Sequence, residues 1–166
     1  MIALWQTFVE LLVTPFQHGE LVWGIVPLYF ALLLNETTPA RADFRTAIQT
    51  GFSFLWSAAH WLYPYLRWGR SGWPMAMWDH LPLINLCVTL LVAGLGALAL
   101  TGGLRRRFVR GTRFLGHSRF ANYFMIAIFP IQSGHLPWTW ERLGAVIVFA
   151  LPAWALLHVG LMPFRR

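Results

Sequence analysis

Two long apolar stretches without charge limit what this chain can fold into more than any other feature. Leu81 to Thr101 and Leu143 to Phe164 contain no Asp, Glu, Lys or Arg. Each is about as long as the roughly 20 residues that a transmembrane helix needs. The composition agrees, because 57% of the residues are hydrophobic and 11% are charged, against about 25% charged in ordinary soluble domains. The sequence therefore predicts an all-α integral membrane protein that forms a single domain over residues 1–166.

The apolar pattern predicts five membrane crossings, with four as the alternative. Proline, glycine and charged residues end helices, and they separate the apolar stretches from one another. The first 18 residues form a different pattern, with apolar side chains at helical spacing and the breakers Pro15 and Gly19. Such a segment is typical of an amphipathic helix that lies in the membrane interface. The expected spans lie near residues 20–37, 46–66, 81–101, 119–135 and 143–164.

The arginines predict how the spans are oriented. All thirteen basic residues are arginine, and six of them lie between Arg105 and Arg119. Arginine-rich loops stay in the cytoplasm. With this loop inside, five crossings place ten arginines on the cytoplasmic side and three outside, whereas four crossings give eight and five. The favoured arrangement is a multi-pass protein of the bacterial inner membrane with a cytoplasmic C-terminus.

Two helix surfaces are suited to contact with other helices. Gln49, Ser53, Ser57 and His60 recur at intervals of four, four and three residues, so they share one face of a helix. A polar stripe within a membrane helix is expected to face protein rather than lipid. In the span 81–101 small residues would let another helix approach closely; they are Ala93, Gly94, Gly96, Ala97 and Ala99.

His60 is the candidate for binding a cofactor, because an ionisable group inside a span is a functional hypothesis by default. The stretch Ser57 to Trp68, SAAHWLYPYLRW, resembles the C-terminal half of a bacterial light-harvesting polypeptide. That resemblance implies that His60 ligates bacteriochlorophyll, and a haem is the other cofactor considered. The chain departs from the family at Trp56, where a small residue is expected, and in having several spans rather than one. The alternative is that His60 forms a hydrogen bond between helices and that no cofactor is bound.

The histidines also raise the question of a metal site, because imidazole is a common ligand of transition metals. With five crossings, His117 and His158 lie toward the inner side, whereas the outer side receives His18, Glu20, His60, Asp79, His80, His135 and Glu141. A site built from Asp79, His80 and His135 is the metal hypothesis. The alternative is that these residues lie at the level of the lipid headgroups.

No nucleophile elbow, P-loop or paired histidine motif is present, so we expect a protein that is not an enzyme. Arginines that flank apolar spans also favour anionic lipids over nucleic acid as the counter-charge. The expected function is a non-catalytic subunit of a larger bacterial membrane complex. The alternatives are a small oligomeric transporter or channel and a cofactor-binding subunit of an electron-transfer or light-harvesting assembly. Contact with partner subunits or lipids is expected at Arg105, Arg106, Arg107, Arg110, Arg113, His117, Arg119, Asn122 and Tyr123.

Overall fold

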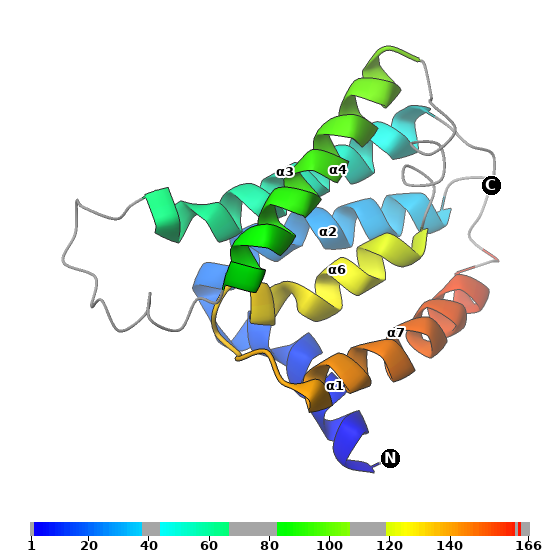
Figure 1. The fold of residues 1–166 in the computed structure, drawn as a ribbon. Coiled ribbons are helices and arrows are strands. Elements are labelled where there is room, and N and C mark those ends of the chain that lie inside the picture. The colour runs from blue at the N-terminus through cyan, green and yellow to red at the C-terminus, as the bar shows by residue number, and fades with distance from the viewer. Residues whose placement is uncertain (1, 38–43, 67–82, 107–118, 162, 164–166) are drawn as a thin grey trace.

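Helices account for nearly all of the part of the chain that the structure describes, which confirms the all-α prediction (Figure 1). This computed structural model describes residues 2–37, 44–66, 83–106, 119–161 and 163. The helices are α1 (Ile2–Gln17), α2 (Gly19–Thr37), α3 (Phe44–Leu66), α4 (Leu83–Leu104), α6 (Arg119–Gln132) and α7 (Trp140–Gly160). Each overlaps an expected segment. Helix α7 begins earlier than expected because the Thr139 side chain caps it by accepting a hydrogen bond from the backbone N–H of Arg142.

From α2 onward the helices run up and down, so that their termini gather at two ends of the bundle. Contacts between the termini identify each end. The end that holds the junction of α1 and α2 is called the corner end, and it contains His18, Glu20, Asn85, His135 and Trp138. The opposite end is called the far end, and it contains Glu36, Phe44, Gly103 and His158.

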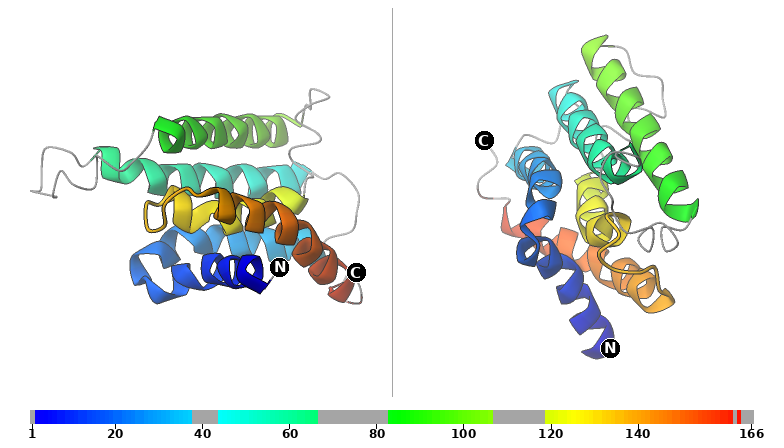
Figure 2. Two further views of the ribbon diagram at one scale, coloured as in Figure 1. Left: turned by 60° about the horizontal axis from the view of Figure 1, so that its bottom comes forward. Right: turned by 90° about the vertical axis from the view of Figure 1, so that its left-hand side faces the viewer.

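Helix α1 lies on one side of the bundle and α4 on the other, as both views of Figure 2 show. The axis of α1 is bent by 110° from that of α2 at the break around His18, as Pro15 and Gly19 predicted. Helix α1 then runs along α7, with Trp5 and Phe8 packed on Phe149. The N-terminal segment is therefore a helix of its own, folded back onto the last helix of the chain.

Glycines bring α3 and α4 into backbone contact. A Cβ atom placed on Gly51 of α3 would lie 2.5 Å from the backbone nitrogen of Leu100, and one placed on Gly96 of α4 would lie 3.0 Å from the carbonyl oxygen of Gly51. Of the predicted small-residue surface, Gly96 and Ala99 are buried in this contact, whereas Gly94 has nothing near its Cβ position. The predicted close approach is confirmed, and its partner is a helix of the same chain.

The middle of the polar stripe of α3 faces protein, as predicted, whereas Gln49 and His60 at its ends are partly exposed. Ser53 and Ser57 are at most 1% exposed, and so is the neighbouring Thr50, whose hydroxyl accepts a hydrogen bond of 3.1 Å from the side-chain amide of Asn35 on α2. The hydrogen bond joins α2 and α3 inside the bundle. Burial of this stripe explains how a helix with so many hydroxyl groups packs among apolar neighbours.

By length and apolar content, α4 and α7 are each able to cross a membrane, and α1 with α2 would add a third span if this bent pair crosses as one. The other two helices of the described chain do not meet the same criteria, because α3 carries many polar residues and α6 has only 14 residues. The coarse expectation of long apolar helices is therefore confirmed. These criteria alone qualify two helices, or three spans if the bent pair crosses as one, and the count of five crossings stays a prediction.

Candidate functional site

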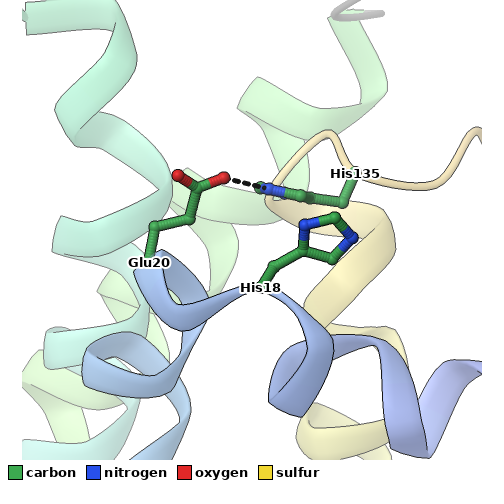
Figure 3. Close-up of side chains that lie close together, drawn as sticks. All are labelled: His18, Glu20 and His135. Carbon is green, nitrogen blue, oxygen red and sulfur yellow. Dashed lines mark hydrogen bonds and ion pairs between the residues drawn. The ribbon is translucent and has the colours of Figure 1, made fainter.

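Three side chains that can each bind a metal meet at the corner end, and we call His18, Glu20 and His135 the His–Glu cluster (Figure 3). Nε2 of His135 lies 2.7 Å from Oε1 of Glu20. The rings of His18 and His135 have centroids 4.9 Å apart. One ligand atom of each residue lies within 4.8 Å of the others.

The backbone holds both sides of the cluster in place. His18 occupies the break between α1 and α2, where its N–H donates to the carbonyl of Thr14 at 3.3 Å and its carbonyl accepts from Leu21 at 2.9 Å. His135 follows α6 in a turn that contains Gly134 at a φ of 80°, a conformation that suits glycine. The N–H of His135 donates to the carbonyl of Pro130 at 3.1 Å. The cluster thus joins two turns that are more than 110 residues apart in sequence.

The three side chains differ in exposure. The side chain of His135 is 16% exposed, whereas that of Glu20 is 71% exposed and His18 is also at the surface. The imidazole of His135 is therefore fixed by its surroundings, and the other two groups are free to adjust toward it. Chemically, two imidazoles and a carboxylate are the protein ligands of open zinc sites, in which a further position is left for water or another ligand.

The structure brings together only part of the predicted metal site. His135 belongs to the His–Glu cluster, whereas Asp79 and His80 lie outside the described residues. The expected topology puts His18, Glu20 and His135 on the same side of the membrane, but only His135 belonged to the metal hypothesis. The sequence signal that points to His18 and Glu20 is their spacing around Gly19, because a sharp break lets both side chains face the same neighbour.

His60, the candidate for a cofactor, packs between α2 and α6. Its ring stacks on Phe129 with centroids 5.5 Å apart and an angle of 29° between the planes. A Cβ atom on Gly24 would lie 2.7 Å from Cγ of His60, so the backbone of α2 covers the ring closely. Among the described residues, His60 has aromatic and steric contacts with Phe129 and Gly24, and its ring is also near enough to Glu20 and His135 to interact with them electrostatically.

The predicted contact cluster for partners or lipids divides into three groups. Arg105 and Arg106 are exposed at the end of α4. Asn122 and Tyr123 are 0% and 7% exposed and face the interior of the bundle. The side chains outside the described set are those of Arg107, Arg110, Arg113, His117 and Arg119.

The far end has an acid and histidine pair that the sequence did not suggest. The carboxylate of Glu36 is 0% exposed, and its Oε2 lies 2.9 Å from Nδ1 of His158. Helix α2 therefore carries a carboxylate paired with a histidine near each of its ends. This role of Glu36 could not be predicted, because a polar residue at the end of a span, next to a loop, is usually exposed to water.

The comparisons with known proteins do not identify a relative. No protein-family model, curated protein or solved structure matches this chain.

Proposed function

We propose that this chain is a non-catalytic, integral membrane subunit of a larger bacterial membrane complex, with five crossings and a cytoplasmic C-terminus. The support is the large apolar surface on its two longest apolar helices. Within the chain, 28% of the α4 segment and 17% of the α7 segment is buried. Side chains such as Leu91 and Leu156 are 62% and 75% exposed. Lipid and partner helices are the surroundings that accept such faces, because both are apolar.

The observation that carries the proposal is the outer face of α4. Gly94, Ala97 and Thr101 are exposed at intervals of three and four residues, which places them on one face of the helix. Leu90 and Leu98 flank them and are 57% and 52% exposed. In membranes, small residues at this spacing let two helix backbones approach closely, which strengthens their packing. We infer that a helix of another subunit packs here, in the way that α3 packs on the opposite, buried face of α4.

The test is purification from native membranes in a mild detergent, comparing Gly94→Leu with Gly160→Leu. Neither glycine has a packing neighbour among the described residues within 4 Å of its Cβ position, so a leucine at either place starts in open space and is expected to leave the fold of the chain itself intact. Gly160 lies near the end of α7 and is the matched control. The wild type and Gly160→Leu are expected to migrate as a complex of defined mass, and Gly94→Leu is expected to lose the partner.

Three results would contradict the proposal. The first is a wild-type protein that migrates alone at 19.0 kDa. The second is a complex that keeps the same mass in Gly94→Leu. The third is a complex whose mass is a simple multiple of the chain, which would favour an oligomeric transporter or channel.

The cavity beside Gln49, about 270 Å³, is otherwise lined by apolar residues, which suits lipid tails better than a polar solute.

A further inference from the structure

We propose that the His–Glu cluster of His18, Glu20 and His135 binds one divalent transition-metal ion of the zinc type. This site joins the junction of α1 and α2 to the turn between α6 and α7. It differs from the hypothesis based on Asp79 and His80, and it does not depend on the proposed role as a subunit.

The separations between the ligand atoms fit an ion placed between them. Zinc lies about 2.0 to 2.2 Å from imidazole nitrogen and carboxylate oxygen, so two ligand atoms of a tetrahedral site are about 3.4 Å apart. In the cluster the ligand atoms lie within 4.8 Å of one another, and the Glu20 to His135 pair is at 2.7 Å. Small rotations of the exposed Glu20 and His18 side chains close the difference, while the largely buried His135 stays fixed.

The ligand set selects the class of metal. Two nitrogens and one oxygen suit zinc and similar borderline ions, whereas calcium and magnesium prefer oxygen ligands alone. A carboxylate also offsets part of the charge of the ion. Because Glu20 and His18 are exposed, the fourth position of the metal opens to the outside of the bundle, where water or an external ligand completes it.

The position of the cluster gives the metal a structural consequence. His18 belongs to the break between α1 and α2, and His135 to the turn that leads from α6 into α7. These segments also meet through the packing of α1 on α6 and α7 and through the contact of Glu20 with His135. A hydrogen bond from Thr7 to Glu141 and the ion pair of Glu10 with Arg142 further join α1 to α7. An ion held by all three residues fixes the 110° bend of the chain. Binding therefore stabilises the folded chain through mass action.

The experiment uses the full-length protein in detergent with an affinity tag that contains no histidine, after treatment with a chelator. Zn²⁺ is titrated against a competing dye, and Co²⁺ is added separately to obtain the visible absorption bands of a tetrahedral site. We expect one ion per chain. At an ion concentration about 100-fold above the dissociation constant, the unfolding temperature is expected to rise by about 5 to 10 °C.

The variants His18→Ala, Glu20→Gln and His135→Ala are each expected to weaken binding by at least about 10-fold. Two of these residues are exposed, so His18→Ala and Glu20→Gln are expected to keep the fold and to unfold at the temperature of the metal-free wild type. Glu141→Gln and His158→Gln remove a carboxylate and a histidine outside the cluster, and they are expected to bind as the wild type does. The proposal is overturned if the wild type binds no ion, or if His18→Ala and Glu20→Gln both bind it with unchanged affinity.

Discussion

The contact between α3 and α4 predicts that the same substitution lowers stability at one glycine relative to another. In Gly51→Ala the new methyl group would lie 2.5 Å from the nitrogen and 2.9 Å from the Cα of Leu100, and 2.8 Å from the carbonyl oxygen of Gly96. Carbon contacts are most favourable at about 3.5 to 4.0 Å, so the two helices must separate by about 1 Å. All three obstructing atoms belong to backbone and cannot rotate away.

The magnitude follows from comparison with Gly94→Ala, which meets no atom within 4 Å. Both variants gain about 1 kcal/mol because alanine is the better helix former, and this gain cancels in the comparison. Overpacking costs about 1 to 3 kcal/mol. We therefore expect Gly51→Ala to be less stable than Gly94→Ala by about 1 to 3 kcal/mol, with Gly94→Ala at or above the wild type.

The assay is reversible unfolding in mixed micelles of a mild detergent and dodecyl sulfate, followed by far-ultraviolet circular dichroism. The difference between the two variants is measured directly, so uncertainty in the unfolded state largely cancels. Equal midpoints for Gly51→Ala and Gly94→Ala would refute the reasoning, because they would mean that α3 and α4 are not in backbone contact at Gly51.

Two further predictions concern the far end and the outer face of α4. His158→Phe removes one hydrogen bond to the buried carboxylate of Glu36 and should lower stability by about 1 to 3 kcal/mol. His135→Phe removes the contact with the exposed Glu20 and should cost at most about 1 kcal/mol in metal-free protein. Unfolding midpoints that rank the two variants in the reverse order would contradict this. Cys87, the only cysteine, is exposed on α4, so in intact vesicles it should react with a membrane-impermeant maleimide far more slowly than after solubilisation in dodecyl sulfate. Equal labelling in both conditions would argue against α4 as a span.

The helices could be predicted from sequence because their signals are local. Apolar stretches, prolines and glycines delimit α2, α3 and α4 to within a few residues of their observed bounds. Which of the small residues pack against another helix of the chain could not be predicted in full. Gly96 and Gly94 are two positions apart in the same apolar stretch, yet one packs on Gly51 and the other faces outward. That choice depends on how α4 is rotated relative to α3, which no local pattern records.

The candidate site could be predicted only in part for the same reason, because its residues are far apart in sequence. The expected alternation of helices grouped His18, Glu20 and His135 at one end, and the structure brings them together there, because alternating helices return every second terminus to the same side. Selecting these three residues required the position of the turn after α6 relative to the break before α2. That position is set by packing between helices, such as the contact of Phe129 with Gly24, and the pairing with Glu20 spans 115 residues of sequence.

The pairing of α1 and α2 with α6 and α7 also determines the order in which the molecule is completed during synthesis. Helices α1 and α2 leave the ribosome long before α6 and α7, which cover them. Glu36 and His158 are 122 residues apart in sequence, and Thr7 and Glu141 are 134 residues apart. Helices α3 and α4 can pair as soon as both are made. Helix α2 can also pack on α3 early, but the surfaces of α1 and α2 that meet α6 and α7 must wait for the end of the chain, and during this interval the carboxylate of Glu36 lacks His158. Biogenesis of this protein therefore depends on what shelters the first two helices until the last one arrives.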